Sequence, residues 1–375
     1  MKSTLLLMIA LIACLAPHTA AQDESTFTDD LGVTYTVERY NIANYPVAMA
    51  FTPDGRLFYT EKETGNVRVI GTDGVRQPEP VISLPTSSLV ERGLLGIAVD
   101  PNYETNGYIW VAHIRPSTTR ELASHDVVRF YEEDGIGSDP KVMFSIPLKN
   151  NALIHHGGNL AFDDEGRLFF TVGDNEDPAN SQDLNTVQGA IHRFDITAEG
   201  LRPAEGNPDE DNSIFAHGFR NPFDLVIDPY TTNLTRIFAT ENGADCDDEI
   251  NMVLRGFDYG AGPDYVCGEA SPESDEIFTL PPMVSYTPTV APTGITIYTH
   301  EAVPEWQGEV FFCTWNQGQL MRITLNEDRN QLEAINQLDL GGAQCRIDIT
   351  VTPDGALIFT TVGVNGGEIY RVIPQ

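Results

Sequence analysis

A histidine pair stands directly before two glycines in the segment His155-His156-Gly157-Gly158. Histidine is the usual proton acceptor at neutral pH, and glycine lets a flat ligand come close to the backbone. The segment is therefore a candidate site for a catalytic base. The alternative is that both histidines lie in a loop and cap backbone groups, and the residue types alone favour this alternative.

An arginine and an asparagine follow each other as Arg220-Asn221 in the sequence GFRNP. A guanidinium offers a rigid fork of donors to oxygen-rich ligands, and an amide supplies both a donor and an acceptor. The two residues therefore indicate a ligand-binding site. An ion pair between Arg220 and a carboxylate explains the arginine equally well, because the chain is strongly acidic.

The densest acidic stretch is ENGADCDDEIN, which covers residues 241–251. Carboxylates beside a flexible glycine suit Ca²⁺. The spacing is not that of an EF-hand, so a solvated acidic loop is the alternative interpretation. A second acidic segment, at 174–177, offers the same ligand types, although turn and capping roles are commoner for such residues.

The strands that must position these segments are predicted by a sequence pattern that repeats along the chain. An apolar-x-apolar triplet, a turn containing Pro, Asp or Gly, and a second apolar strand recur in six copies, of which MAFTPDGRLFYTE at 49–61 is the first. Alternating apolar residues predict strands, and the turn reverses the chain. Each copy therefore predicts an antiparallel hairpin.

Six such units filling the chain are typical of propeller blades. We predict an all-β fold, a six-bladed β-propeller of four-stranded antiparallel blades, that forms one domain over 22–375. The strand near Val33–Asn41 is expected to join the C-terminal blade and close the ring. An irregular stack of β-sandwiches is the weaker alternative. Propellers carry function on the loops at one end of the central channel, where the chemical segments are expected to meet.

Residues 1–21 are typical of an export signal. Lys2 precedes an apolar run, Leu5–Leu15, and small residues follow it as a cleavage site. The run is shorter than the roughly 20 apolar residues that span a bilayer. The sequence LIAC also resembles a bacterial lipobox, which would put a lipid on Cys14; alternatively, Cys14 is one more apolar residue of the signal. Both interpretations predict an extracytoplasmic protein, either secreted, periplasmic or lipid-anchored at the cell surface.

The chain carries a net charge of −33. So acidic a protein is unsuited to nucleic acid or anionic membrane as a partner. An anionic ligand is also disfavoured unless cations or local arginines offset the field. A solvated acidic surface that keeps an exported protein soluble is the simplest explanation of the charge.

Four cysteines follow the signal segment, namely Cys246, Cys267, Cys313 and Cys345. Three connectivities are possible. In an oxidising compartment we expect the pairs that are near in sequence, 246 with 267 and 313 with 345. No spacing of cysteine and histidine indicates zinc.

Several segments, taken together and in this order, resemble the soluble glucose and aldose sugar dehydrogenases that depend on pyrroloquinoline quinone (PQQ). The resemblance spans the chain after the signal segment. Its landmarks are ERGLLGIAVDPNY (91–103), HHGGNLAFDDEGRLFFTVGD (155–174), AHGFRNPFDLVIDP (216–229), ATENGADCDDEINMV (239–253), DYG (258–260) and APTGITIY (291–298).

The resemblance implies a mechanism for three of these residues. His155 would take the proton from the anomeric hydroxyl of an aldose while a hydride passes to the quinone. Arg220 and Asn221 would hold the quinone oxygens and stabilise the charge that develops there. An external electron acceptor would then reoxidise the cofactor.

The resemblance also implies two calcium sites. One Ca²⁺ would bridge the cofactor to the backbone carbonyls of Gly243 and Ala244 and act as a Lewis acid. Asp248 would line the sugar side. A second, structural Ca²⁺ would use the carboxylate of Glu249 and a carbonyl near Tyr259.

The chain departs from the family pattern at cofactor-binding positions. Glu91 and Asn242 stand where the family has glutamine, and Asn316 falls where a cofactor-binding lysine is expected. An RxRD arrangement becomes the segment 345–348, in which Arg346 alternates to the other face of the strand. PQQ carries three carboxylates, so the loss of several cations would weaken its binding.

These departures favour a second function, a non-catalytic propeller that has lost the quinone and binds a carbohydrate or a protein. A third and weaker alternative is a calcium-dependent lactonase, which is another activity of six-bladed propellers.

Overall fold

Each repeated phrase folds as an antiparallel hairpin, as its alternating pattern predicts. In the first copy Phe51 pairs with Leu57, and in the last copy Val351 pairs with Leu357. Gly55 closes the first turn with a φ of 86°, a backbone conformation that only glycine adopts without cost. The Pro-Asp-Gly turns therefore fix where the first and last hairpins reverse.

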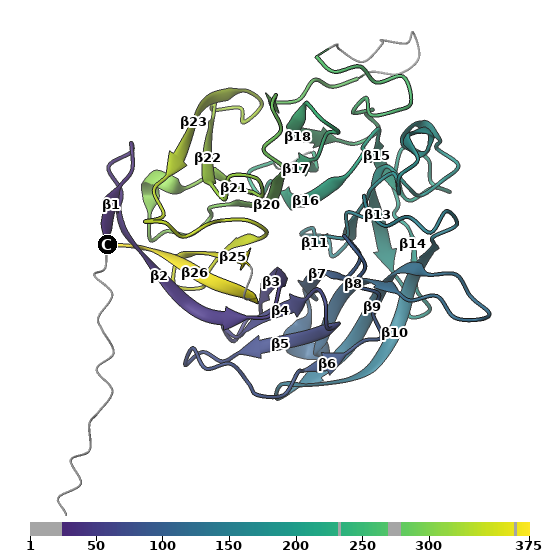
Figure 1. Cartoon of the computed structure of the whole chain (residues 1–375), viewed down its shortest axis with the longest axis horizontal. Helices are drawn as coiled ribbons and strands as arrows, with labels where there is room; N and C mark the ends of the chain where they lie inside the picture. The colour runs from purple at the N-terminus through teal and green to yellow at the C-terminus, as the bar shows by residue number, and fades with distance from the viewer. Residues whose placement is uncertain (1–24, 232–233, 269–278, 364–365) are drawn as a thin grey trace, which may run out of the picture.

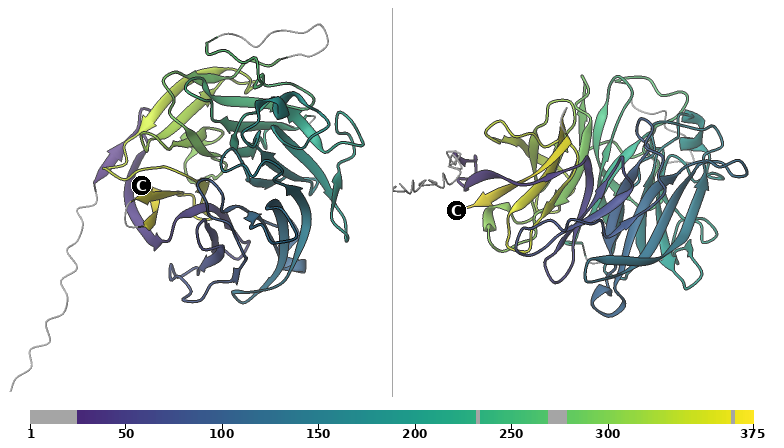
Figure 2. Two further views of the ribbon diagram at one scale, coloured as in Figure 1. Left: turned by 45° about the vertical axis from the view of Figure 1, so that its right-hand side comes forward. Right: turned by 60° about the horizontal axis from the view of Figure 1, so that its bottom comes forward.

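The computed structural model describes residues 25–231, 234–268, 279–363 and 366–375. In these residues the hairpins extend into six antiparallel sheets. Figure 1 shows the sheets arranged as blades around a common centre, and Figure 2 shows the same ring from two further directions. The predicted six-bladed β-propeller is confirmed.

The blades follow one another along the chain, each running from an inner to an outer strand. Blade 1 contains β3 (Pro46–Phe51), β4 (Leu57–Glu61), β5 (Asn66–Ile70) and β6 (Ile82–Ser83). Blade 2 contains β7 (Leu94–Val99), β8 (Tyr108–Arg115), β9 (Ser124–Glu133) and β10 (Ile136–Pro147). Blade 3 contains β11 (Leu160–Phe162), β12 (Leu168–Val172), β13 (Ala190–Ile196) and β14 (Leu201–Pro203), with β15 (Ile214–His217) paired to β13.

Blade 4 contains β16 (Pro222–Ile227), β17 (Arg236–Glu241), β18 (Asp248–Leu254) and β19 (Val284–Tyr286). Blade 5 contains β20 (Pro292–Ile297), β21 (Val310–Thr314), β22 (Leu320–Leu325) and β23 (Leu332–Leu338). Blade 6 contains β24 (Ile349–Val351), β25 (Leu357–Gly363), β26 (Gly366–Pro374), β2 (Thr34–Ala43) and β1 (Thr26–Thr28). The short helical turns are α1 (Tyr103–Asn106), η1 (Pro178–Gln182) and η2 (Pro304–Trp306).

The core lies between neighbouring blades rather than at the axis. Phe238 of blade 4 packs with Ile295 and Phe312 of blade 5 in one such layer. The second strand of every blade is buried on both faces, which explains why these strands are continuous apolar runs such as LFF and VFF. The layers between blades leave the inner strands to line the central channel.

Buried carboxylates tie the inner strands of neighbouring blades together. Asp224 at the start of β16 accepts a hydrogen bond from Ile295 N of the next blade, with a distance of 2.8 Å. Asp348, directly before β24, accepts one from Met49 N of blade 1 at 2.7 Å. Burial raises the pKa of Asp224 to about 7, and it raises the pKa of Asp348 well above its usual range.

Glycine occupies the equivalent inner position in two other blades. A Cβ on Gly96 of β7 would lie 2.1 Å from the carbonyl oxygen of Gly158, and one on Gly294 of β20 would lie 2.5 Å from Cα of Asp348. A side chain at either position would push neighbouring blades apart. These glycines therefore let the backbones approach closely around the channel.

The ring is closed by a strand from the other end of the chain. β2 pairs with β26 over a register that runs from Tyr35 opposite Pro374 to Ala43 opposite Gly367. Figure 2 shows these purple and yellow strands side by side. The expected role of the strand near Val33–Asn41 is confirmed.

A buried arginine holds the N-terminal segment against blade 5. The side chain of Arg322 is fully buried and forms ion pairs with Asp29 at 2.5 Å and Asp30 at 2.7 Å. Trp306 Nε1 also donates to Asp29. The closing strands are therefore anchored by charge as well as by pairing.

Both expected disulfides are present. Cys246 is bonded to Cys267, and Cys313 to Cys345. The second bridge joins β21 to the segment before β24 and so links blades 5 and 6.

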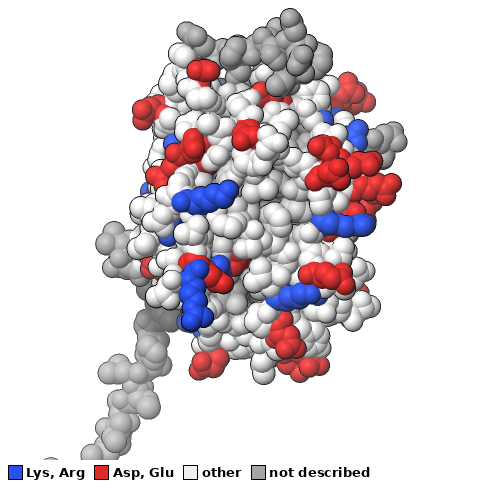
Figure 3. Space-filling model, turned by 90° about the vertical axis from the view of Figure 1, so that its right-hand side faces the viewer, with Lys and Arg blue, Asp and Glu red and all other residues white. Residues whose placement is uncertain are grey.

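The predicted signal segment and Cys14 lie outside the described residues. Within the described part of the chain, no helix has the length and apolarity needed to cross a membrane. Figure 3 shows acidic side chains scattered over the face in view with basic ones between them. The basic side chains on this face are thus dispersed among the acidic ones, as on a solvated surface.

Candidate active site

A cavity of about 360 Å³ opens where the inner strands of the six blades begin. The residues that line it come from loops far apart in the sequence. They are Tyr45, Val47, Lys62, Val90, Glu91, Leu95, His156, Gly157, Asn159, Asn221, Phe223, Asn242, Ala291, Thr293, Trp315, Ile347 and Asp348. The channel loops thus meet at one end, as the propeller predicts.

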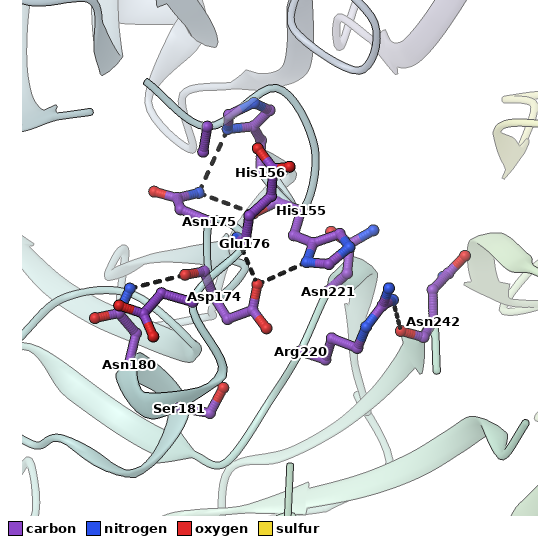
Figure 4. Close-up of polar contacts among 12 residues, drawn as sticks. His155, His156, Asp174, Asn175, Glu176, Asn180, Ser181, Arg220, Asn221 and Asn242 are labelled. Carbon is purple, nitrogen blue, oxygen red and sulfur yellow. Dashed lines mark hydrogen bonds and ion pairs between the residues drawn. The ribbon is translucent and has the colours of Figure 1, made fainter. Parts of the chain in front are cut away.

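His155 forms a short hydrogen bond to a buried carboxylate; its own side chain lines neither cavity described here, whereas the next two residues, His156 and Gly157, line the first one. His155 Nδ1 lies 2.6 Å from Oδ1 of Asp174, as Figure 4 shows. The backbone of His155 has a φ of 59°, and its N–H donates to Glu91 Oε2 at 2.6 Å. A Cβ on Gly173 would lie 2.3 Å from the carbonyl oxygen of His155, so the loop needs glycine there. These contacts fix the orientation of the imidazole.

The second ring nitrogen of His155, Nε2, is not used by the contact with Asp174. With Nδ1 donating to the carboxylate of Asp174, the neutral imidazole has its lone pair on Nε2. No described residue forms a hydrogen bond to this nitrogen. The arrangement is that of an oriented general base.

Arg220 and Asn221 lie beside the histidine loop because one buried carboxylate holds both of their backbones. Glu241 Oε1 accepts from Arg220 N and from Asn221 N, each at 2.8 Å. Asn221 Oδ1 in turn accepts from Gly157 N at 3.2 Å. The predicted Arg-Asn pair and the predicted histidine segment are therefore brought together (Figure 4).

The guanidinium of Arg220 points to the acidic loop. Its Nη1 donates to the carbonyl oxygens of Asn242 at 2.7 Å and Gly243 at 2.8 Å. No carboxylate forms an ion pair with Arg220 among the described residues, so the ion-pair alternative does not account for this arginine. The side chain is half-buried.

A second cavity, of about 250 Å³, is lined by Arg220, which does not line the first. Asp174, Glu241, Gly243, Ala244, Asp247, Glu249 and Tyr259 are among the residues that line it. Glu241 is buried, and its Oε2 has no hydrogen-bond partner among the described residues. Burial raises the pKa of Glu241 well above its usual range and the pKa of Glu249 to about 7.

These donors fit a calcium ion. Ca²⁺ takes carboxylate and carbonyl oxygens in flexible geometry, and a cation would neutralise the buried acids that otherwise carry a desolvation cost. A Gly243 carbonyl that accepts from Arg220 keeps a second lone pair for a ligand. Cys246 and Cys267, which lie close to Asp247, are bonded to each other and offer no thiolate ligand.

Asp248 has a different environment from these acids. Its Oδ1 accepts from Gly243 N at 2.9 Å, and its Oδ2 accepts from Ala291 N at 2.6 Å. The residue is buried and lines neither cavity. In this structure Asp248 holds the acidic loop to the loop before β20.

Two predicted cofactor positions line the first cavity, and one does not. Glu91 and Asn242 line it, and Asn242 Nδ2 donates to Pro292 O at 2.8 Å. Asn316 is exposed and donates to Thr289 O at 3.0 Å. Its neighbour Trp315 lines the cavity instead.

The segment 345–348 contributes its last two residues to the cavity. Ile347 and Asp348 line it, whereas Arg346 is absent from the lining. Arg346 donates to Trp315 O, and its guanidinium lies 5.9 Å from the centre of the Trp315 ring. The arginine thus supports the tryptophan from outside the cavity.

Sequence reasoning missed the roles of three site residues. The hairpin register offers a signal for Asp174: Leu160 pairs with Phe170, and continuing the same register towards the loop brings residue 175 opposite residue 155, so Asp174 is the direct neighbour of the residue that faces His155. Lys62 and Trp315 carried no such signal, because both follow ordinary apolar strands.

The comparisons with known proteins show the family and the fold. The family model described as "Glucose / Sorbosone dehydrogenase" matches residues 43–371. The aldose sugar dehydrogenase YliI of Escherichia coli is 25% identical, covering 88% of this chain and 91% of that protein.

Solved structures show the same fold. A putative oxidoreductase (glucose dehydrogenase) from Thermus thermophilus has a TM-score of 0.76 at 25% identity, covering 90% of this chain and 100% of the other. The PQQ-bound form of aldose sugar dehydrogenase from Streptomyces coelicolor has a TM-score of 0.72 at 24% identity, covering 91% and 98%. The match of the family model over most of the chain shows that the chain belongs to the glucose/sorbosone dehydrogenase family.

Proposed function

We propose that this protein oxidises aldose sugars at the anomeric carbon in a reaction that depends on PQQ and Ca²⁺. The observation that carries the proposal is the 2.6 Å contact of His155 Nδ1 with Asp174, next to Arg220 and Asn221 at the end of the channel. Membership of the glucose/sorbosone dehydrogenase family supports it. So does the relative in Escherichia coli that is named as an aldose sugar dehydrogenase.

His155 is the base in this proposal. Its Nε2 takes the proton of the anomeric hydroxyl, and Asp174 stabilises the imidazolium that forms. PQQ, when bound, supplies the acceptor for the hydride that leaves the anomeric carbon. The sugar is thereby oxidised to a lactone, and the two electrons leave to an external acceptor.

Arg220 and Asn221 hold and polarise the cofactor in this proposal. The amide nitrogen of Asn221 has no hydrogen-bond partner among the described residues, while its oxygen is fixed by Gly157. The Arg220 guanidinium carries a full charge beside it. Both groups supply donors where negative charge develops on quinone oxygens.

Calcium has two places in the proposal. The carbonyls of Gly243 and Ala244 would hold the ion that polarises the cofactor, and Glu249 with a carbonyl near Tyr259 would hold a structural ion. Both sets line the second cavity. Asp248 keeps the first set in place through Gly243 N.

The proposal includes an extracytoplasmic location. The two disulfides favour an oxidising compartment. A signal over residues 1–21, either cleaved or lipid-modified at Cys14, would deliver the protein there. A soluble sugar and an acceptor outside the cytoplasm are then its partners.

The test begins with protein stripped of metal by a chelator. PQQ is titrated in the presence and absence of Ca²⁺ while the quinone absorbance is followed, and aldose oxidation is then measured with a dye acceptor. We expect near-stoichiometric, calcium-dependent binding and sugar-dependent reduction of the dye. A wild-type protein that binds no PQQ at any Ca²⁺ concentration would exclude the dehydrogenase and leave a carbohydrate- or protein-binding propeller. Lactone hydrolysis without quinone would identify a lactonase.

Substitution of the base separates catalysis from folding. His155→Ala should abolish dye reduction while the thermal unfolding temperature stays close to that of the wild type. His300→Ala is the matched control, because His300 lies between β20 and β21 and lines neither cavity. Full activity of the His155→Ala protein would remove His155 from its role.

A further inference from the structure

Lys62 is a buried cation at the wall of the central cavity. It directly follows β4 and is 8% exposed. Among the described residues that line the cavity, it is the one lysine or arginine. Its ammonium therefore provides the positive charge of that wall.

Neighbouring residues fix the position of the Lys62 backbone and leave room for its side chain. A Cβ on Gly93 would lie 2.4 Å from Cγ of Lys62, so a glycine there leaves room for the lysine stem. Lys62 N donates to Tyr45 O at 3.1 Å, and Leu94 N donates to Lys62 O at 3.2 Å. The backbone is thus held between blades 1 and 2, and the side chain has a defined direction.

The ammonium is incompletely paired. Nζ donates to the carbonyl oxygen of Val90 at 2.7 Å and lies 5.1 Å from the centre of the Tyr45 ring. No carboxylate lies within ion-pair distance of Nζ among the described residues. A buried cation without a charged partner is costly unless a ligand completes its shell.

The two acids that line the same cavity form no ion pair with the Lys62 ammonium. Glu91 lines the same cavity, but its Oε2 accepts from the backbone of His155. Asp348 also lines the cavity, and its two oxygens accept from the backbones of Met49 and Ile349. Two of the three ammonium protons of Lys62 therefore remain for an anion.

We propose that Lys62 binds a carboxylate of the quinone cofactor. The inference rests on the proposed function and names a residue for it. PQQ carries three carboxylates and needs cations in its pocket. Asn316 is uncharged and bonded to Thr289 O, and Arg346 is bonded to Trp315 O outside the cavity. Lys62 replaces that charge from blade 1 rather than from blades 5 and 6.

The experiment measures PQQ affinity and stability in the same variants. Metal-stripped protein is titrated with PQQ at saturating Ca²⁺, with tryptophan fluorescence as the readout because Trp315 lines the cavity. Lys62→Met removes the charge, and Lys62→Arg keeps it. Lys141→Met is the matched control: it removes the same charge from an exposed residue on the outer strand β10.

We expect the Kd for PQQ to rise about 10- to 100-fold in Lys62→Met, as for loss of a hydrogen bond to a charged group. Lys62→Arg should recover part of the affinity, and Lys141→Met should leave it unchanged. Without PQQ, the unfolding temperature of Lys62→Met should equal or exceed that of the wild type, because an unpaired buried charge is gone.

The outcomes separate the inference from the function. Wild-type binding together with an unchanged Kd in Lys62→Met overturns the role of Lys62 and leaves the proposed function standing. A fall in both apo stability and affinity assigns Lys62 a purely structural role as the tether of Val90, and also overturns the inference. A wild-type protein that binds no PQQ overturns the proposed function, and the inference with it.

Discussion

Asp174 accepts a hydrogen bond from His155 across the hairpin of blade 3, with Oδ1 2.6 Å from Nδ1. The same carboxylate oxygen also accepts from the backbone of Glu176 at 2.9 Å. The carboxylate is thus fixed by its own loop before it fixes the histidine. Orientation of the His155 ring is therefore a property of the β11–β12 hairpin.

Replacement of Asp174 by asparagine should lower kcat for aldose oxidation by about 100-fold or more. An amide cannot stabilise the imidazolium as a carboxylate does, and general base catalysis contributes about 10²- to 10⁴-fold. The Kd for PQQ should change little, so the two measurements separate positioning of the base from cofactor binding. An equal loss in affinity and kcat would mean that Asp174 supports the pocket as a whole.

Replacement of Gly96 by alanine should destabilise the protein and lower its activity together. The new Cβ would lie 2.1 Å from the carbonyl oxygen of Gly158, in the loop that carries His155. Overpacking of this kind typically costs about 1–3 kcal/mol. Chemical denaturation and dye reduction report the two effects. Gly363→Ala is the control, because a Cβ there meets nothing within 4 Å.

Asp224 should make the protein less stable as the pH rises from about 4 to 7. Burial raises its pKa from 3.8 to about 7 in the folded state, so the folded protein holds a proton that the unfolded chain releases. The resulting stability is complete below the unfolded pKa and is lost as the pH rises through the folded pKa; at 1.36 kcal/mol per pKa unit it amounts to at most about 4 kcal/mol.

Denaturant unfolding across this pH range in Asp224→Asn checks the prediction. The variant should show a flatter dependence of the unfolding free energy on pH than the wild type. Asp134→Asn, a change at an exposed turn, should leave the wild-type slope intact. Parallel pH curves for Asp224→Asn and wild type would contradict the assignment.

Calcium should raise the unfolding temperature of the metal-stripped protein. Binding to the folded state alone stabilises by about 2.7 kcal/mol at a concentration 100 times the Kd. Glu249→Gln should remove the part of this gain that comes from the structural ion while remaining as stable as the wild type in chelator, because a buried acid is replaced by a neutral group. A calcium response in Glu249→Gln that equals that of the wild type would place the structural ion elsewhere.

The repeated hairpins made the fold predictable, because the pattern of alternating residues and Pro-Asp-Gly turns is local. The closing strand was also predictable, since six hairpins need a partner for the last blade. The position of Asp348 was harder to foresee. Its exposure to the cavity depends on how blade 6 meets blade 1, where Met49 N binds its carboxylate. Contacts between blades have no signature in a single sequence.

The residues expected to bind the cofactor were also hard to predict from a single sequence. The family pattern drew attention to Asn316 and Arg346, and both lie outside the cavity lining. Lys62 lines it from another blade, at a position that resembles the polar end of an ordinary strand. A charge can move between blades without disturbing the repeat, because the residues that follow the second strands of blades 1, 4 and 5 all line the same cavity.

The pairing of β2 with β26 has a consequence for how the molecule forms. Residues 34–43 are made early, but their partner ends at Pro374. The first strand therefore has no edge to join until synthesis of the chain is almost complete. Contacts over so long a sequence separation form slowly. Assembly of the ring is thus a late, whole-chain event, and a chain truncated before β26 keeps two exposed sheet edges that invite aggregation.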